Sequence, residues 1–180
     1  ISLIFHCCQS LKINQKDIVQ SKTLIIENRG FENFVIDSTT IKDVIKKYGK
    51  NYEEIEYGKY SYNTEIKYRQ LGLSFWFETS DSSKTISAID FYFPFEGITS
   101  RGIELNKSKM SDVKLAHDTL DWYTTNTSPY WFSEHVGIEY AVERDTILPR
   151  YPLDEKLHTT KKIIKIGVLN NKEELEENEY

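Results

Sequence analysis

Apolar and polar residues alternate in two stretches near the middle of the chain. Residues 71–77 read Leu-Gly-Leu-Ser-Phe-Trp-Phe, and residues 86–93 read Ile-Ser-Ala-Ile-Asp-Phe-Tyr-Phe. A period of two residues is typical of a strand with one buried face, and the polar turn at residues 79–83 predicts an antiparallel hairpin. Trp76 and Tyr92 fall on the outward face. The residues expected to point inward are Leu71, Leu73, Phe75, Phe77, Ile89, Phe91 and Phe93.

A different period precedes this hairpin and predicts a short amphipathic helix. Its apolar positions are Ile41, Val44, Ile45 and Tyr48, which lie on one face of a helix. Thr39 or Thr40 is a suitable N-cap, Asp43 lies in the first turn, and Gly49 is a suitable end. We therefore expect a helix over residues 41–48.

The remaining pattern predicts further strands and a second helix. Residues 23–26 form a strand-like run, and a second helix is expected around Met110–Leu120. Residues 50–70 are rich in tyrosine and charge, which indicates one or two short strands with a turn at Tyr57-Gly58-Lys59.

The second half of the chain repeats the order of the first. Residues 105–113 align with 36–44, residues 136–142 with 71–77, and residues 163–168 with 86–91. Ordered matches of this kind predict a duplicated unit of about 70 residues. The expected fold is α+β, a tandem repeat of strand-helix-antiparallel β units with the helices packed on one face of a shared curved antiparallel sheet. The expected divisions are an N-terminal lead at 1–33, repeats at 34–100 and 101–171, and an acidic tail at 172–180.

Both predicted helix starts carry a short motif. They read Thr39-Thr-Ile-Lys-Asp43-Val44, followed by Tyr48-Gly49, and Ser108-Lys-Met-Ser-Asp112-Val113. Over residues 34–170 the pattern resembles the superfamily that contains the beta-lactamase inhibitor protein and the small lipoprotein of the outer-membrane barrel-assembly machinery. The resemblance implies helices on one side of a sheet whose open face grips another protein. Neither repeat has the inhibitor's cysteine pair, and Asp37 and Asn106 stand near the positions where the family usually has glycine.

Composition limits the classes of protein that fit. The chain has 180 residues, a net charge of −5 and a pI near 5.5, without a dense run of lysine and arginine. A nucleic-acid binder is therefore not expected. No stretch of 18 apolar residues encodes a transmembrane helix. Its 12 Tyr, 9 Phe and 3 Trp supply material for a core and for an interface.

The two cysteines are adjacent and follow an apolar stretch. Cys7 and Cys8 come after Ile-Ser-Leu-Ile-Phe-His and before a polar segment. This arrangement resembles the end of a bacterial lipoprotein signal, which would place a lipid on Cys7 or Cys8 and the protein in the cell envelope or periplasm. The alternative is a cytoplasmic protein with reduced thiols.

Motifs that carry catalysis or bind cofactors are weak in this sequence. The histidines do not have the spacing of a zinc site, no Gly-x-Ser-x-Gly turn occurs, and the glycines form no phosphate-binding loop. These histidines are His6, His117, His135 and His158. We expect no catalytic residue, no metal, no cofactor and no enzyme activity.

Aromatic residues outside the inward stripe are the candidate site. Large exposed aromatics are typical anchors of protein interfaces. The predicted partner-binding residues are Trp76, Tyr92, Tyr60, Tyr62, Glu139, Trp122 and Trp131. Outward acidic groups favour a basic partner by electrostatic attraction. These groups are Glu78, Asp90, Glu139 and Glu143.

The predicted function is a non-catalytic protein-binding module, monomeric and exported or lipid-anchored, that grips a protein partner through an open sheet face. An inhibitor or immunity protein against a basic toxin or enzyme is the narrower form of this hypothesis. Two alternatives stay open: a structural lipoprotein of the envelope, and a hydrolase with a cleft between the repeats.

Overall fold

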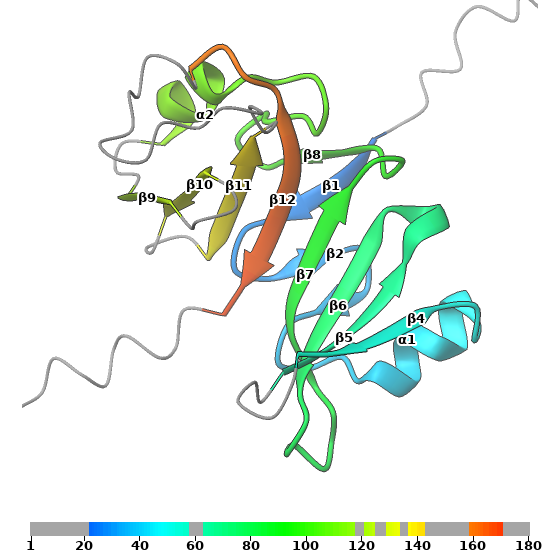
Figure 1. Ribbon diagram of the computed structural model, residues 1–180. Coiled ribbons are helices and arrows are strands. Elements are labelled where there is room, and N and C mark those ends of the chain that lie inside the picture. Colours follow the sequence, from blue (N-terminus) through cyan, green and yellow to red (C-terminus); the bar gives the residue numbers. More distant parts are fainter. Residues whose placement is uncertain are drawn as a thin grey trace, which may run out of the picture.

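The described residues form two β-sheets and two short α-helices that enclose one core (Figure 1). The computed structural model describes residues 22–57, 63–117, 121–124, 129–133, 137–142 and 159–170, with the backbone alone for 121–124 and 129–133. No helix in these ranges is long and apolar enough to cross a membrane.

The larger sheet has eight strands, and every neighbouring pair in it is antiparallel. Its spatial order is β4-β5-β6-β7-β12-β11-β10-β9. The strands are β4 (Glu53–Glu56), β5 (Asn63–Tyr68), β6 (Leu73–Glu78), β7 (Ile86–Tyr92), β9 (Asp121–Thr124), β10 (Pro129–Ser133), β11 (Ile138–Val142) and β12 (Ile163–Leu169). The hairpin of β6 and β7 confirms the predicted pairing, and β7 and β12 join the two halves at the centre.

The smaller sheet has the order β3-β2-β1-β8, with β1 parallel to β8. Its strands are β1 (Thr23–Ile26), β2 (Gly30–Phe31), β3 (Phe34–Val35) and β8 (Gly97–Thr99). It lies behind β7 and β12 in Figure 1. The Phe31 ring contacts the rings of Phe34, Phe75 and Phe91, so aromatic packing joins the two sheets.

Helix α1 (Ile41–Tyr48) forms where the apolar period predicts it, with Gly49 at its end. The Thr40 hydroxyl accepts a hydrogen bond from the Asp43 N–H, and the Asp43 carboxylate accepts one from the Thr40 N–H. This reciprocal capping satisfies two donors that the helix itself leaves unpaired. Ile41 and Val44 are buried in the core.

Helix α2 (Met110–Ala116) begins with half of that arrangement. The Asp112 carboxylate accepts a hydrogen bond from the Lys109 N–H. The reciprocal bond is missing, because the side chain of a lysine at the N-cap has no acceptor for the Asp112 N–H. Met110 and Val113 are buried. The helix ends before His117, whose ring lies 2.9 Å from the Tyr140 hydroxyl in the core.

The loops before the two helices bond to the large sheet in the same way. The Asp37 N–H donates to the Ile86 carbonyl, and the Asn106 N–H donates to the Ile163 carbonyl. Asp37 and Asn106 adopt φ values of 61° and 62°. Asp and Asn tolerate this left-handed conformation better than most residues, which explains how they replace glycine at these turns.

The predicted fold class is nevertheless wrong, because the chain is mostly β. The layer that packs on the large sheet contains a second sheet, and the two helices have only 8 and 7 residues. Repeated units with helices packed on a sheet are not supported. The sequence pattern missed the second sheet because β2, β3 and β8 have two or three residues each, too few to show a period.

Two inward positions of the predicted hairpin also differ. Phe93 lies beyond the end of β7 and is 75% exposed, because the chain turns there. Leu71 belongs to a short 3-10 helix, Arg69–Leu71, and only borders the core. The alternation therefore holds within the strands and fails where the turns begin. The division of the chain into residues 1–33, 34–100, 101–171 and 172–180 stays a prediction.

Candidate functional site

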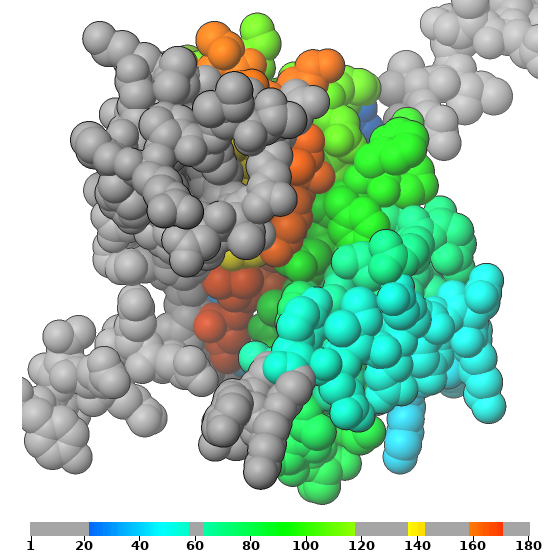
Figure 2. All heavy atoms as spheres, viewed as in Figure 1, coloured from blue at the N-terminus to red at the C-terminus, as the bar shows by residue number. Residues whose placement is uncertain are grey.

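The outer face of the large sheet, opposite the core, carries a row of four polar residues and one glycine across five strands. Their Cα atoms are in register from β5 to β11: Lys67, Ser74, Asp90, Gly167 and Glu139. Because side chains alternate along each strand, the intervening residues point into the core. Figure 2 views this face, and atoms of β7 and β12 lie at the surface there.

Lys165 of β12 is the centre of a buried charge cluster. Its Nζ lies 3.0 Å from Asp90 Oδ2 and 2.7 Å from Glu139 Oε1, and Trp76 Nε1–H donates to Asp90 Oδ2 at 3.0 Å. A Cβ at Gly167 would lie 2.5 Å from Glu139 Cγ and 2.9 Å from Asp90 Oδ1. The absence of a side chain at residue 167 therefore lets both carboxylates approach the same ammonium group.

Burial and charge set the pKa values of this cluster. Desolvation raises the pKa of Asp90, against the attraction of Lys165. Burial by itself would lower the pKa of Lys165, but the negative charges of Asp90 and Glu139 outweigh it and raise the pKa. Lys165 is therefore a stable cation between two carboxyl groups.

Glu65 of β5 forms a second polar centre on the same face. Its carboxylate accepts hydrogen bonds from the Tyr57 hydroxyl at 2.5 Å, from Lys67 Nζ at 3.2 Å and from the Ser74 hydroxyl. Burial would raise the pKa of Glu65, but these three donors outweigh it and lower the pKa. A carboxylate with several donors is held in one orientation, as is the Tyr57 side chain bound to it.

Aromatic rings pack above the polar residues. The Tyr57 ring stacks on the Trp76 ring with a centroid distance of 5.0 Å and an interplanar angle of 24°. Lys67 Nζ lies 5.0 Å from the centre of the Tyr92 ring, and the Tyr92 hydroxyl donates to the Leu73 carbonyl. Tyr57 remains 48% exposed, so it forms the outer surface of this stack.

Three of the predicted partner-binding residues lie on this one face. Trp76, Tyr92 and Glu139 are half-buried, and a hydrogen bond to a neighbouring residue holds each of them. Asp90 points to the outer face as expected, but it is 7% exposed and paired with Lys165, so it is not an exposed acidic group there.

The other predicted residues are further away or outside the described part. Trp122 in β9 and Trp131 in β10 are Cα partners near the far edge of the sheet. The positions for which the structure gives no description are Tyr60, Tyr62, Glu143, Cys7 and Cys8.

Four residues that organise the face were not among the predicted site residues: Tyr57, Glu65, Lys67 and Lys165. Glu65 and Lys67 alternate with the core-facing residues of β5, and the same period would have placed them on the outer face. Tyr57 follows the last residue of β4. Lys165 and Gly167 alternate with the buried residues of β12, but only the pairing of β12 with β7 brings them to Asp90.

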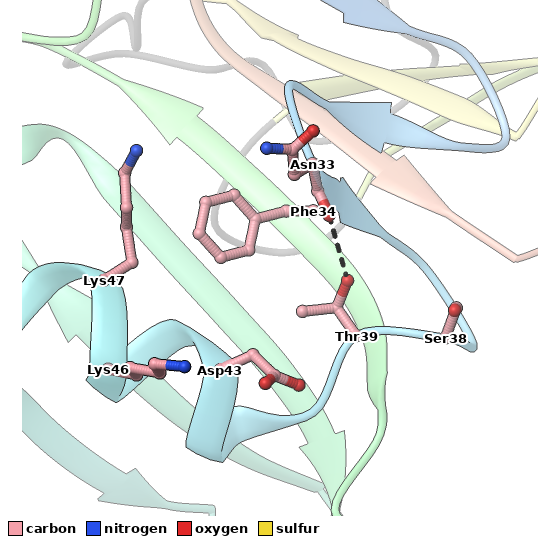
Figure 3. Close-up of a pocket in the computed structure, with 7 residues that line it drawn as sticks. All are labelled: Asn33, Phe34, Ser38, Thr39, Asp43, Lys46 and Lys47. Carbon is pink, nitrogen blue, oxygen red and sulfur yellow. Dashed lines mark hydrogen bonds between the residues drawn. The ribbon is translucent and has the colours of Figure 1, made fainter.

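A pocket of about 500 Å³ lies between β3 and α1 (Figure 3). The Phe34 ring points from β3 toward helix α1, which carries Lys46 and Lys47. Its lining residues are Asn33, Phe34, Ser38, Thr39, Asp43, Lys46 and Lys47. Asp43 already caps α1, and Lys47 pairs with Glu32 at 3.9 Å, so the pocket has little excess charge of either sign.

The carboxylates of Glu65, Asp90 and Glu139 on the outer face are bound by lysine, tryptophan, tyrosine or serine donors. The described residues contain no group of three or more His, Cys, Asp or Glu that could hold a metal ion.

Comparisons with known proteins agree with a β-rich fold and add no function. No family model and no curated protein matches the sequence. A similar solved structure is the crystal structure of the uncharacterized protein YfeY from Escherichia coli, with a TM-score of 0.54 and 14% identity, over 83% of this chain and 100% of that chain. At this identity the likeness shows the fold alone. The resemblance to the beta-lactamase inhibitor superfamily stays a prediction.

Proposed function

We propose that the chain is a non-catalytic protein-binding module that contacts a protein partner through the outer face of its eight-stranded sheet. An exported or lipid-anchored inhibitor or immunity protein is the narrower form of this proposal. The placement outside the cytoplasm rests on the sequence around Cys7 and Cys8.

The observation that carries the proposal is the position of Tyr57. Its ring stacks on Trp76 and its hydroxyl is bound to Glu65, yet nearly half of the side chain is exposed. A tyrosine that is already held in place loses little conformational entropy when a partner covers it. Such aromatics contribute a large share of the binding free energy in protein interfaces.

The test compares capture of partners by the full chain and by variants. Tyr57→Ala removes the exposed ring, whereas Tyr57→Phe keeps the stack and removes only the hydroxyl. Leu115→Ala is the matched control, because Leu115 is 87% exposed on α2. Each variant is first shown to unfold at the same denaturant concentration as the wild type. A partner identified by mass spectrometry is then purified and its Kd is measured for all four proteins.

We expect Tyr57→Ala to weaken binding at least about ten-fold, with smaller changes for Tyr57→Phe and Leu115→Ala. Equal affinities for Tyr57→Ala and the wild type would contradict the proposal. So would a purified partner that forms no complex with the wild-type chain.

A further inference from the structure

Strand β4 lies at one end of the large sheet and has β5 as its neighbour there. Every second residue of an edge strand directs its N–H and C=O groups away from its neighbour. No backbone hydrogen bond from another described segment reaches Glu53–Glu56 on the free side. Atoms of this region lie at the surface in Figure 2.

The side chains of β4 give this edge a definite charge. Three of its four residues are glutamates, and the fourth is Ile55. Glu53 is bound by Arg69 at 2.6 Å. Glu54 and Glu56 are exposed and form no ion pair with any described residue. Both of them point to one side of the sheet, whereas Glu53 and Ile55 point to the side that carries Tyr57.

These charges decide which kind of strand the edge accepts. In an antiparallel pairing of two copies centred on Ile55, Glu54 of each copy would face Glu56 of the other. Like charges directly opposite each other destabilise a strand pair. A strand with lysine or arginine at alternate positions would instead place its cations beside Glu54 and Glu56. The remaining side chains of the added strand would point to the other face of the sheet, beside Ile55 and the exposed ring of Tyr57.

We infer that the free edge of β4 binds an extended, basic segment of a protein partner as an added strand. The inference rests on the proposed function and narrows it, since Tyr57 directly follows β4 and joins the edge to the aromatic stack. Backbone hydrogen bonds supply affinity in strand addition, and alternate side chains supply specificity.

The first experiment uses the full chain and a synthetic peptide of about eight residues that alternates lysine with valine. A control peptide of the same sequence carries N-methyl groups on alternate backbone amides, so it keeps the charge but cannot donate the pairing hydrogen bonds. Affinity is measured by fluorescence anisotropy, and amide hydrogen exchange by NMR locates the bound peptide. We expect slower exchange at β4 and at least about ten-fold weaker binding of the N-methylated peptide.

Charge variants provide the second arm. Glu54→Lys combined with Glu56→Lys reverses the charge of the edge, and Glu32→Lys combined with Glu96→Lys makes the same change in net charge at exposed positions outside the large sheet. We expect the β4 variant to bind the lysine peptide at least about ten-fold more weakly and the control variant to change affinity less than about three-fold.

Three results would overturn the inference. These are equal binding of the two peptides, slower exchange elsewhere than β4, and slower exchange at β4 caused by raised protein concentration without peptide, which would assign the edge to a second copy. The proposed function is judged separately. If the purified partner is lost with Tyr57→Ala but retained by the Glu54→Lys/Glu56→Lys variant, the sheet face binds and the edge does not.

Discussion

The two faces of the eight-stranded sheet use the same strands for different chemistry. On the inner face, Phe75 and Phe91 pack with the second sheet and are fully buried. On the outer face, Asp90 is almost as buried, but its surroundings are Lys165 and the Trp76 N–H. The inner face is stabilised by apolar area removed from water, whereas the outer face depends on each polar group having its partner.

This difference shows that burial alone does not make a group of residues an apolar core. An apolar side chain tolerates a changed neighbour if the volume remains filled. A buried charge tolerates no loss of its counter-charge, because the remaining group is left in a poorly solvated position. Substitutions on the two faces should therefore differ in kind as well as in size.

The largest effect is expected on the inner face. Phe75→Ala removes a ring that contacts Phe31, Phe34 and Tyr68, and leaves a cavity that the rigid sheets fill poorly. We expect the free energy of unfolding to fall by about 3–5 kcal/mol, measured by urea denaturation. A loss below about 1 kcal/mol would show that the inner face repacks easily.

A somewhat smaller effect is expected at the centre of the outer face. Lys165→Met keeps most of the side-chain volume but leaves Asp90 and Glu139 without their cation. We expect a loss of about 2–4 kcal/mol in the free energy of unfolding near neutral pH.

The control for this prediction is the double variant Lys165→Met/Asp90→Asn. Neutralising Asp90 removes one of the two stranded charges, so the double variant should be more stable than Lys165→Met alone. Strictly additive losses in a double-mutant cycle would mean that the two side chains do not interact as their geometry indicates.

The smallest effect is expected at Glu65 and depends on pH. Its pKa in the folded protein lies below its ordinary value of 4.5, so its contribution to stability is present above pH 4.5 and is lost as the pH falls through the folded-state pKa. Glu65→Gln should cost about 1–2 kcal/mol at neutral pH. The difference between the wild type and the variant should shrink as the pH falls below 4.5.

Urea denaturation of both proteins from neutral to acidic pH checks this sign. The raised pKa of Asp90 changes stability with pH in the opposite direction, but it is common to both proteins and cancels in their difference. A difference that stays constant down to acidic pH would contradict the role of Glu65 as an ionised acceptor.

Local pattern was sufficient for the elements with a clear period or cap. The 23–26 strand, the helix over 41–48 and the hairpin that contains Phe75 and Phe91 were predicted from the residues and are present. The period of two predicts an inward Phe93, but the strand ends at Tyr92 and Phe93 is exposed.

The candidate site could be predicted only in part. Alternation placed Trp76, Tyr92 and Glu139 on an outward face, and the structure puts them on the same face. It gave no sign that Tyr57 would cover Trp76 or that Lys165 would reach Asp90. These contacts join residues far apart in the chain, and no local period reports on them.

The sequence by itself determined the faces: which side chains of a strand or helix point together follows from the period of two or of 3.6 residues, a local property of the backbone. It also limited the helix cap to Thr39 or Thr40, and the structure has the cap at Thr40, three residues before its partner Asp43. Only the tertiary structure decided that β1, β2, β3 and β8 form a second sheet, that β7 lies beside β12, and that a buried ion cluster occupies the outer face. Strand pairing depends on the free energy of the whole chain, and a short strand carries little information about its neighbour.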